Sequence, residues 1–211
     1  MSDNTAIAKQ IVDFMAFSER LKKEMRHSYL SNKRQESVAE HTWQMAMLAV
    51  MTYPYLKTPV DMLRVMKMIA IHDLAEAEVG DVSHLDQMAN PDLKKLKDQR
   101  EKAAMEKFRA MLPSPINDEI YAIWSEYEDR VSNESKFVKA LDDIEVQIQH
   151  NLAPFDTWEE KEFDITFTKT DRNCRHDPFL TELAAAVVQS TVQKMTDAGY
   201  DVDAIRKRAA A

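Results

Sequence analysis

Glycine is almost missing from this chain. Gly80 and Gly199 are the only two among 211 residues. A dinucleotide-binding turn and a P-loop each need at least two closely spaced glycines, because the backbone must approach a phosphate. Both kinds of site are therefore excluded. If the protein handles phosphate, it must use charged side chains, helix termini or a metal ion.

Cysteine is equally rare, since Cys174 is the only one. A single thiol excludes a disulfide within the chain and a zinc site built from cysteines, and it suits the reducing cytoplasm, where we expect the protein. The sequence also lacks the ~18 consecutive apolar residues of a membrane span. Its N-terminus has no basic start followed by an apolar block, as a secretory signal would.

The balance of charge limits the partners. The chain carries a formal net charge of −8 at neutral pH. An acidic surface repels nucleic-acid polymers and anionic lipids, and it favours the capture of cations. We therefore expect neither a nucleic-acid polymer nor a membrane as a partner.

Helical periodicity dominates the chain. Apolar residues recur at intervals of three and four, and no alternating run is long enough for a sheet. The sequence predicts an all-α fold in a single domain, residues 1–211, as a bundle of seven or eight helices. Its motif-bearing core covers about residues 10–152, before an irregular excursion over 153–178 and C-terminal helices. The predicted helices span residues 5–25, 37–52, 60–78, 92–111, 116–130, 134–152, 179–196 and 201–208.

Two of these helices have recognisable ends. The helix over 37–52 opens with Ser37, and Glu40 follows three positions later, which is the pattern of a capping box. Its apolar residues cover most of its surface, so we expect it to be central in the fold. The helix over 60–78 is followed by Gly80, in the usual place of a helix-terminating glycine.

Metal-capable and proton-carrying side chains crowd the end of the 60–78 helix. His72 and Asp73 are adjacent, and Glu76 lies one turn after His72 on a helix. The preceding residues are largely apolar and must be buried, and a buried His–Asp pair is costly unless something satisfies it. A metal ion would do so. Hydrogen bonds to loop backbone at the helix end are the alternative.

Two further candidates lie on other predicted helices. His41 is near the start of the 37–52 helix, where a core histidine donating to a carbonyl is the alternative. Asp142 flanks the apolar face of the 134–152 helix, whereas Asp143 is expected to face solvent; the alternative is an exposed acidic pair. Two imidazoles and two carboxylates suit a divalent ion such as Mn²⁺, Fe²⁺, Co²⁺, Ni²⁺ or Zn²⁺.

In this order, His41, His72-Asp73 and Asp142 resemble the H…HD…D pattern of the HD-domain metal-dependent phosphohydrolases. The similarity extends to the surrounding segments, which resemble the branch that includes bacterial and eukaryotic 5′-deoxynucleotidases. It spans about residues 10–152. The segments that carry it are ESVAEHTWQMAMLA (36–49), KMIAIHDLAEAEVGD (67–81), WSEYEDR (124–130) and KFVKALDDIE (136–145).

The resemblance implies that His41, His72, Asp73 and Asp142 bind one divalent metal ion, whose identity the sequence leaves open. It also gives Glu76 a catalytic role, and the chemistry agrees. A metal ion lowers the pKa of bound water and polarises a phosphoryl oxygen. A neighbouring glutamate can exchange a proton with that water or with the leaving alkoxide. A surface glutamate is the alternative.

The resemblance further implies two substrate-binding residues. Asp81 matches an aspartate near the substrate sugar, where its carboxylate would accept a hydrogen bond from a 3′-hydroxyl. Arg26 matches an arginine that faces the phosphate, which a guanidinium fits with paired donors. A turn aspartate and a solvated arginine at a helix end are the alternatives. The family tends to carry an aromatic residue soon after this arginine, and here His27 follows, which leaves the base and sugar contacts open. Glu36 is a candidate for holding His41 or a water beside the site, and a surface position is the alternative.

The sequence therefore predicts a metal-dependent phosphoric monoester hydrolase. We expect it to convert nucleoside 5′-monophosphates, deoxynucleotides above all, to nucleoside and phosphate. Two alternatives stay open: a phosphodiesterase or pyrophosphohydrolase acting on another nucleotide, and a non-catalytic HD protein that binds a metal or nucleotide. Arg26 and Asp81 lining a small pocket would favour the monophosphatase. The resemblance and the wide apolar helix faces suggest a homodimer.

Overall fold

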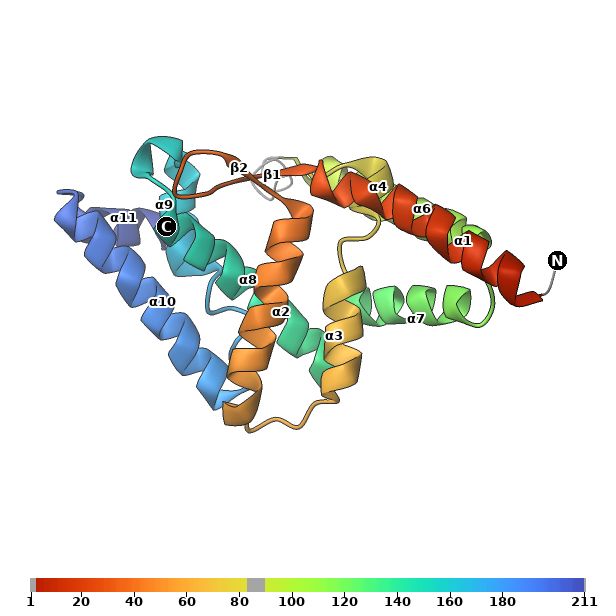
Figure 1. Ribbon diagram of the computed structural model, residues 1–211. Coiled ribbons are helices and arrows are strands. Elements are labelled where there is room, and N and C mark those ends of the chain that lie inside the picture. The colour runs from red at the N-terminus through yellow and green to blue at the C-terminus, as the bar shows by residue number, and fades with distance from the viewer. Residues whose placement is uncertain (1–2, 83–89, 211) are drawn as a thin grey trace.

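The computed structural model describes residues 3–82 and 90–210, and its all-α character confirms the prediction (Figure 1). No helix in these ranges is long and apolar enough to cross a membrane. Short 3₁₀ helices are η1 (Glu19–Lys22), η2 (Tyr53–Tyr55) and η3 (Phe155–Thr157), and the strands are β1 (Met25–Tyr29) and β2 (Gln35–Ser37). The α-helices are α1 (Asp3–Ser18), α2 (Val38–Thr52), α3 (Met62–Ile71), α4 (Glu76–Val79), α6 (Pro91–Met111), α7 (Ile116–Asp129), α8 (Asn133–Leu152), α9 (Glu160–Thr168), α10 (Pro178–Asp197) and α11 (Val202–Ala209).

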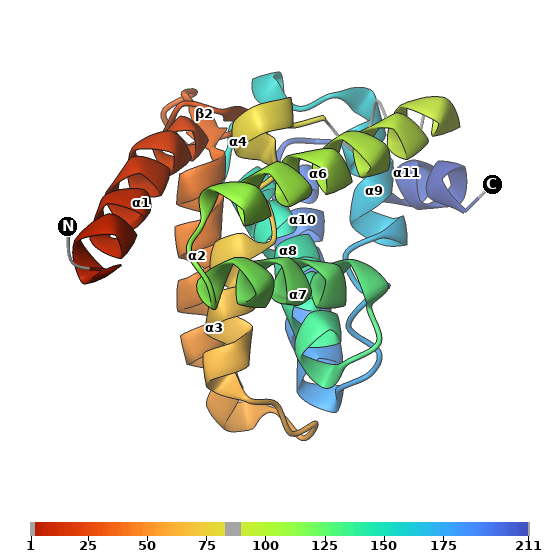
Figure 2. The ribbon, with the colours of Figure 1, turned by 90° about the vertical axis from the view of Figure 1, so that its right-hand side faces the viewer.

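Helix α8 is at the centre of the fold. It packs against α2, α3, α7 and α10, and it also contacts β1. Figure 2 shows α2, α3 and α7 beside it, with α6 crossing the same side of the molecule. Apolar residues on a broad stripe of α8, including Phe137, Leu141 and Ile144, are at most 1% exposed. Every neighbouring helix is therefore positioned by its contact with α8.

Helix α2 is less central than the sequence predicts. One face packs against α3 and α8 and buries His41 and Met45 completely. The opposite face is open, so that Trp43 is 64% exposed and Met51 is 65% exposed. The wide apolar surface of this helix is therefore divided between the core and a patch on the outside of the protein.

A short antiparallel hairpin precedes α2, although the sequence predicts no sheet. Strand β1 pairs with β2. Both strands are too short to show an alternating pattern. Because β1 begins at Met25, the helix predicted over residues 5–25 is shorter than expected, and α1 ends at Ser18. Ser37 ends the hairpin and caps α2. Its Oγ accepts a hydrogen bond from the Glu40 amide at 3.3 Å, and the Glu40 carboxylate accepts one from the Ser37 amide at 2.9 Å, which confirms the capping box.

The helix predicted over residues 60–78 is divided in two. Helix α3 ends at Ile71 and α4 begins only at Glu76. The chain between them makes tight turns, in which the Glu76 amide donates to the carbonyl of Asp73 at 3.0 Å. His72 and Glu76 consequently do not share the face of one continuous helix.

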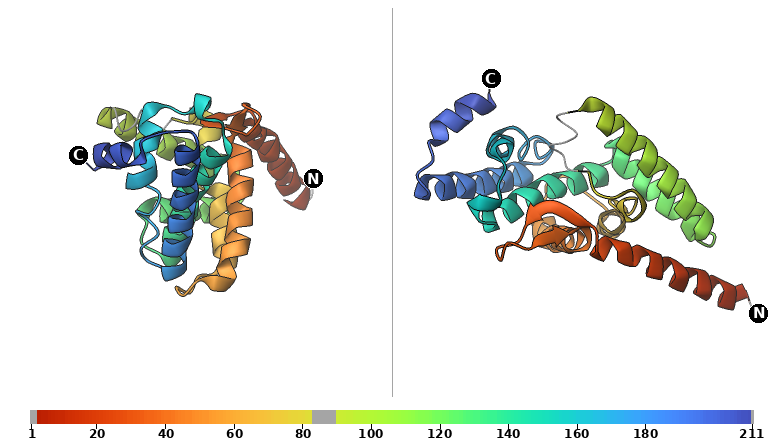
Figure 3. Two further views of the ribbon diagram at one scale, coloured as in Figure 1. Left: turned by 90° about the vertical axis from the view of Figure 1, so that its left-hand side faces the viewer. Right: turned by 90° about the horizontal axis from the view of Figure 1, so that it is seen from above.

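The segment after α8 is more regular than predicted. Helix α9 lies inside the expected irregular excursion and packs against α10 and α11. Phe163, Met195 and Ile205, one from each of these helices, form a small second core. With α4 and α9 added, the described part has more helices than the seven or eight predicted. Seen from above, α1 and α6 diverge at one side of the molecule while α10 and α11 lie at the other (Figure 3).

Asp177 joins two segments that are distant in sequence. It is buried, and its Oδ1 accepts a hydrogen bond from the Phe179 amide at 2.9 Å as the N-cap of α10. Its Oδ2 accepts from the amides of Lys57 at 2.8 Å and Thr58 at 2.7 Å, in the connection between α2 and α3. Burial alone would raise the pKa of this carboxyl, but these hydrogen bonds outweigh it and lower the pKa below its usual value.

We expect Asp177→Ala to lower the free energy of unfolding by roughly 1–3 kcal/mol, since it removes a cap and leaves partly buried amides without their acceptor. The stability that the ionised carboxylate contributes is present above its unfolded pKa of about 3.9 and is lost as the pH falls through the lowered folded pKa. The difference between wild type and variant should therefore shrink below about pH 4 in urea denaturation.

The matched control is Asp201→Ala. Asp201 is an exposed N-cap of α11 that accepts from the Ala204 amide at 2.9 Å. Its loss should cost about 1 kcal/mol or less. Equal losses of unfolding free energy in the two variants would contradict the proposal that Asp177 connects the α2–α3 segment to α10.

Candidate functional site

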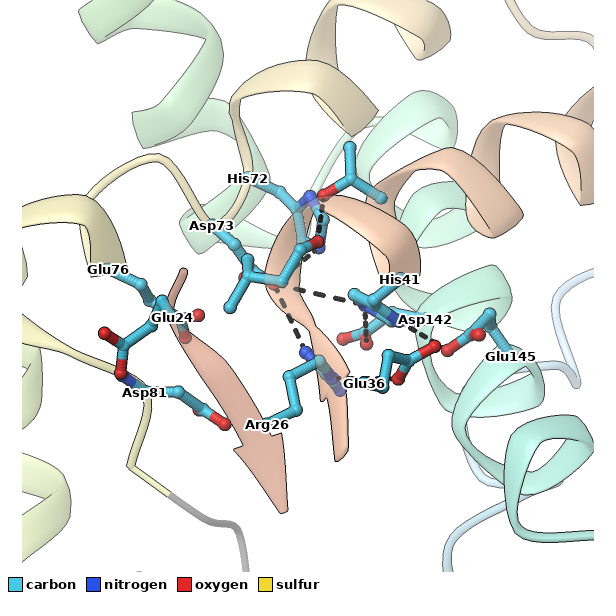
Figure 4. Close-up of polar contacts among 12 residues, drawn as sticks. Glu24, Arg26, Glu36, His41, His72, Asp73, Glu76, Asp81, Asp142 and Glu145 are labelled. Carbon is cyan, nitrogen blue, oxygen red and sulfur yellow. Dashed lines mark hydrogen bonds and ion pairs between the residues drawn. The ribbon is translucent and has the colours of Figure 1, made fainter. Parts of the chain in front are cut away.

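His41 on α2 is fully buried and faces three carboxylates. Its Nδ1 is hydrogen-bonded to Glu145 on α8. Its Nε2 lies 3.3 Å from Asp142 Oδ1 and 3.9 Å from Asp73 Oδ2. Within residues 3–82 and 90–210 this nitrogen has no hydrogen-bond partner. Glu145 therefore orients the ring so that Nε2 points towards the two aspartates (Figure 4).

His72, just after α3, is held in a matching way. Its Nδ1 donates to the carbonyl oxygen of Ile69 at 2.8 Å. Because a carbonyl only accepts, the proton is on Nδ1 and Nε2 carries a lone pair. That Nε2 is 3.1 Å from Asp73 Oδ2 and has no hydrogen-bond partner in the described part of the chain. The acceptor belongs to helix α3 itself and not to loop backbone, as the alternative for His72 supposed, and this bond leaves the second nitrogen available.

The structure brings all four predicted metal ligands together. His41, His72 and Asp73 each offer one ligand atom, and these atoms lie within 4.8 Å of one another. Asp142 approaches the same point through its contact with His41. Two buried imidazole nitrogens without a partner are costly, and a divalent cation would accept both lone pairs. This donor set fits a divalent metal ion.

The charges around His41 favour a cation at this point. Burial and the charge of Arg26 each lower the pKa of His41, but Glu145 and Asp142 raise it overall to about 10. Burial raises the pKa of Asp142, whereas Lys139 and His41 outweigh burial and hold it well below its usual value. Asp142 is therefore ionised, and a proton on His41 or a metal ion can provide the positive charge beside it.

Asp142 points inward, as predicted, but the expectation for Asp143 is wrong. Asp142 Oδ2 accepts hydrogen bonds from Tyr127 Oη at 3.2 Å and from Lys139 Nζ at 2.7 Å. Asp143 is only 3% exposed, and its Oδ2 accepts from Asn173 Nδ2 at 2.6 Å. On helix α8 alone the Asp143 side chain would be exposed, but the chain after α9 packs over it.

Glu76 is buried in the wall of the same pocket, so the surface alternative is wrong. It is 4% exposed, its Oε1 lies 3.7 Å from Lys97 Nζ, and its Oε2 has no hydrogen-bond partner among the described residues. Burial raises the pKa of this carboxyl well above its usual value, and the charges of Asp73 and Asp81 add to the shift. The surroundings of Glu76 therefore favour its protonated form.

Arg26 lies on strand β1, not at a helix end, and its side chain is only 13% exposed. Its Nη1 is 3.5 Å from Asp73 Oδ2, and its Nε is 3.5 Å from Glu36 Oε2. Burial alone would lower the pKa of the guanidinium, but Asp73 and Asp142 raise it overall. The charged arginine therefore faces the cluster and is not solvated.

Gly80 directs the chain back to the pocket after α4. Its φ of 78° lies in a region that L side chains rarely adopt, and its amide donates to the carbonyl of Glu76 at 2.9 Å. A Cβ at this position would lie 3.3 Å from Glu24 Oε1. The same carboxylate accepts from the Asp81 amide at 2.9 Å, which leaves the Asp81 side chain to line the pocket. The predicted glycine stop is confirmed.

The cluster opens into a pocket of about 450 Å³. This volume is in the range of small-molecule sites. Arg26, His72, Asp73, Glu76, Asp81 and Asp142 all line it. The sequence did not indicate its further cations, which are Lys94, Lys97, Arg130, Lys139, Lys169 and Arg172. They collect positive charge in one hollow of an acidic protein.

The sequence offered only Glu36 as a candidate to hold His41, beside a nearby water or a surface position for the same residue. Glu145, not Glu36, is hydrogen-bonded to its Nδ1. Glu36 instead pairs with Arg26, and burial together with the charge of Glu145 raises the pKa of Glu36 to about 7. A usable signal was present, because Glu145 follows Asp142 by three positions and so lies on the same side of α8.

The sequence matches the HD domain family over residues 18–183. The 5′-deoxynucleotidase HDDC2 of Xenopus laevis is 33% identical over 147 residues, which are 69% of this chain and 70% of that protein. The protein of the same name from Homo sapiens is 33% identical over 144 residues, which are 67% of each. A crystal structure of a predicted metal-dependent phosphohydrolase from Magnetospirillum magnetotacticum is similar with a TM-score of 0.73 at 27% identity, over 89% of this chain and 96% of that one. These matches confirm the resemblance that the four motifs carry, and the chain belongs to the HD domain family.

Proposed function

We propose that this protein is a metal-dependent phosphohydrolase that converts deoxynucleoside 5′-monophosphates to nucleoside and phosphate. The observation that carries the proposal is the meeting of several functional groups at one small pocket. Nε2 of His41 and of His72 have no hydrogen-bond partner among the described residues, and Arg26, Glu76 and Asp81 line the pocket beside them. Relatives named 5′-deoxynucleotidases support the substrate class. The limited volume and the lining by Arg26 and Asp81 favour a monophosphate over a larger substrate.

We assign His41, His72, Asp73 and Asp142 as the ligands of one divalent metal ion. Such an ion would polarise a phosphoryl oxygen and lower the pKa of a bound water. The nitrogen and oxygen donors suit Mn²⁺, Co²⁺, Fe²⁺, Ni²⁺ or Zn²⁺, so the choice among them stays open.

Arg26 is assigned to the phosphate. Its guanidinium is fixed between Asp73 and Glu36, so that it lies beside the assigned metal ligands and pays little entropy to bind. A guanidinium can donate two parallel hydrogen bonds to a phosphate. Lys97 and Lys139 line the same pocket and help to balance the charge of the substrate.

Glu76 is assigned as the proton donor to the leaving group. In the hydrolysis the oxygen of water forms the new bond to phosphorus, and the bond from phosphorus to the 5′-oxygen breaks. The proton that Glu76 holds would then go to that 5′-oxygen, so the leaving group departs as a neutral alcohol, and a proton released by the attacking water would return to the Glu76 carboxylate. Asp81 is assigned to the sugar, where its carboxylate would accept a hydrogen bond from the 3′-hydroxyl.

The homodimer and the cytoplasmic location stay predictions. The exposed apolar side chains of α2, Trp43 and Met51 among them, would gain from burial in a dimer. Sedimentation of the purified protein would test the oligomeric state directly.

We expect metal-stripped protein to release phosphate from deoxynucleoside 5′-monophosphates after reconstitution with Mn²⁺, Co²⁺, Ni²⁺ or Zn²⁺. The matching ribonucleotides are tested in parallel. Glu76→Gln should lower kcat by roughly 10²- to 10⁴-fold and leave KM nearly unchanged, because the amide cannot transfer a proton. Glu78→Gln is the control, since Glu78 pairs instead with Arg20 and Lys107. No release with any metal, in protein that binds one, would refute the proposal.

The pH dependence of kcat should follow the proton on Glu76. Because burial raises the pKa of Glu76, its proton-donating form persists to higher pH than that of an exposed glutamate, and kcat should fall as the pH rises through that raised pKa. The residual activity of Glu76→Gln should lack this alkaline fall. An identical fall in wild type and Glu76→Gln would assign the titration to another group.

Arg26→Lys tests the paired donors separately from the charge. We expect kcat/KM to fall roughly 10- to 100-fold, because an ammonium cannot form two parallel hydrogen bonds in a plane. Arg175→Lys is the matched control, since Arg175 is 74% exposed and pairs only with Asp171 among the described residues. Unchanged steady-state kinetics in Arg26→Lys would remove Arg26 from the phosphate site.

A further inference from the structure

Three metal-capable side chains meet outside the central cluster. His27 comes from β1, His150 from α8 and Glu162 from α9, and one ligand atom of each lies within 4.8 Å of the others. Glu162 Oε1 contacts His27 Nε2 and lies 3.1 Å from His150 Nε2. The two imidazole rings are 5.7 Å apart between centroids and inclined at 63°, so both present a nitrogen to the same carboxylate oxygen.

Glu162 is a buried carboxylate without a permanent cation beside it. It is 2% exposed, and within residues 3–82 and 90–210 its ion-pair partners are the two histidines alone. Its Oε2 is occupied as a cap, because it accepts from the Glu159 amide at 2.6 Å. Oε1 is therefore the atom that faces the imidazoles.

The surroundings of Glu162 favour its ionised form. Burial raises the pKa of Glu162, but the hydrogen bond and charge of His150 outweigh it and lower the pKa. Burial lowers the pKa of His27, which favours its neutral form. A buried carboxylate between imidazoles is costly unless a cation accompanies it.

We propose that His27, His150 and Glu162 bind a second divalent metal ion of the zinc or cobalt type. Two imidazoles and one carboxylate are a known set of three protein ligands for zinc, with water in the fourth position. Metal–ligand bonds of about 2.1 Å at tetrahedral angles place a nitrogen and an oxygen about 3.4 Å apart. The 3.1 Å between His150 Nε2 and Glu162 Oε1 is close to this separation, whereas the shorter contact between His27 Nε2 and Glu162 Oε1 would have to lengthen when the ion binds.

Such an ion would connect helices α8 and α9 to the hairpin of β1 and β2. His27 and Glu162 are separated by 135 positions in the sequence, and His27 also lines the substrate pocket. An ion that binds only the folded arrangement stabilises it by mass action. The second site would thus fix the wall of the pocket at which β1 meets α9.

The test is a metal titration of stripped protein with Zn²⁺ and with Co²⁺, with stoichiometry read by calorimetry and metal analysis. Wild type should bind two equivalents per chain. His27→Ala and Glu162→Gln should lose one, with at least about tenfold weaker binding at that site. Asp73→Asn should lose the other. Glu162→Gln retains an oxygen for the Glu159 amide, so circular dichroism should show an unchanged fold.

Two further variants make the readout local. His176→Ala should still bind two equivalents, because His176 lies outside both clusters and bonds through Nδ1 to the carbonyl of Asn173 at 2.9 Å. The Trp158 ring is 5.4 Å from that of His150, so Co²⁺ should quench its fluorescence even in Asp73→Asn protein. Trp158→Phe in the same background should remove that quenching.

One equivalent in wild type, lost in Asp73→Asn, would overturn the inference and leave Glu162 held by a protonated histidine. Two equivalents in His27→Ala and Glu162→Gln would overturn it as well. The outcome is independent of the proposed phosphatase activity, because stoichiometry is measured without substrate and each site has its own variant.

Discussion

A buried histidine between two carboxylates of one helix is the interaction on which the rest of the structure depends. Helix α2 packs on α8 through His41, whose two nitrogens face Glu145 and Asp142. An apolar contact at this point would stabilise the packing without further requirement. Here the carboxylates need a positive charge beside them, which either a proton on His41 or a metal ion can provide. The stability of the core and the occupancy of the candidate metal site are therefore linked.

The pocket gathers cationic side chains that the net charge of the protein does not indicate. The net charge of −8 would repel a nucleotide. Inside the pocket, however, Arg26 and several lysines lie among the carboxylates. Asp73 and Asp142 are assigned to the metal ion and Asp81 to the sugar, and the lining has three further acidic residues, Asp98, Glu101 and Glu128. Burial raises the pKa of Glu76, which favours its uncharged form and so lessens the negative charge near a bound phosphate. An acidic protein can thereby offer a site suited to an anion.

The chain after α8 has more to do with the site than its irregular composition indicates. Asn173 covers Asp143, and Lys169 and Arg172 add positive charge to the pocket. Glu162 meets two histidines from the hairpin and from α8. None of these contacts follows a sequence period, because each joins segments that only the packing of α9 and α10 on α8 brings together.

The sequence by itself determined the all-α class, the capping box at Ser37, the glycine stop at Gly80 and the residues of the central cluster. These depend on local chemistry, in which turn geometry, helix spacing and the pairing of donor types are visible within a few positions. Only the tertiary structure decided the hairpin, the break between α3 and α4 and the burial of Asp143. It also decided that Glu145, rather than Glu36, supports His41. The burial and the partners of a side chain depend on the segments that pack over it. Periodicity along one helix reports only local spacing, so it does not indicate contacts with segments that are distant in the sequence.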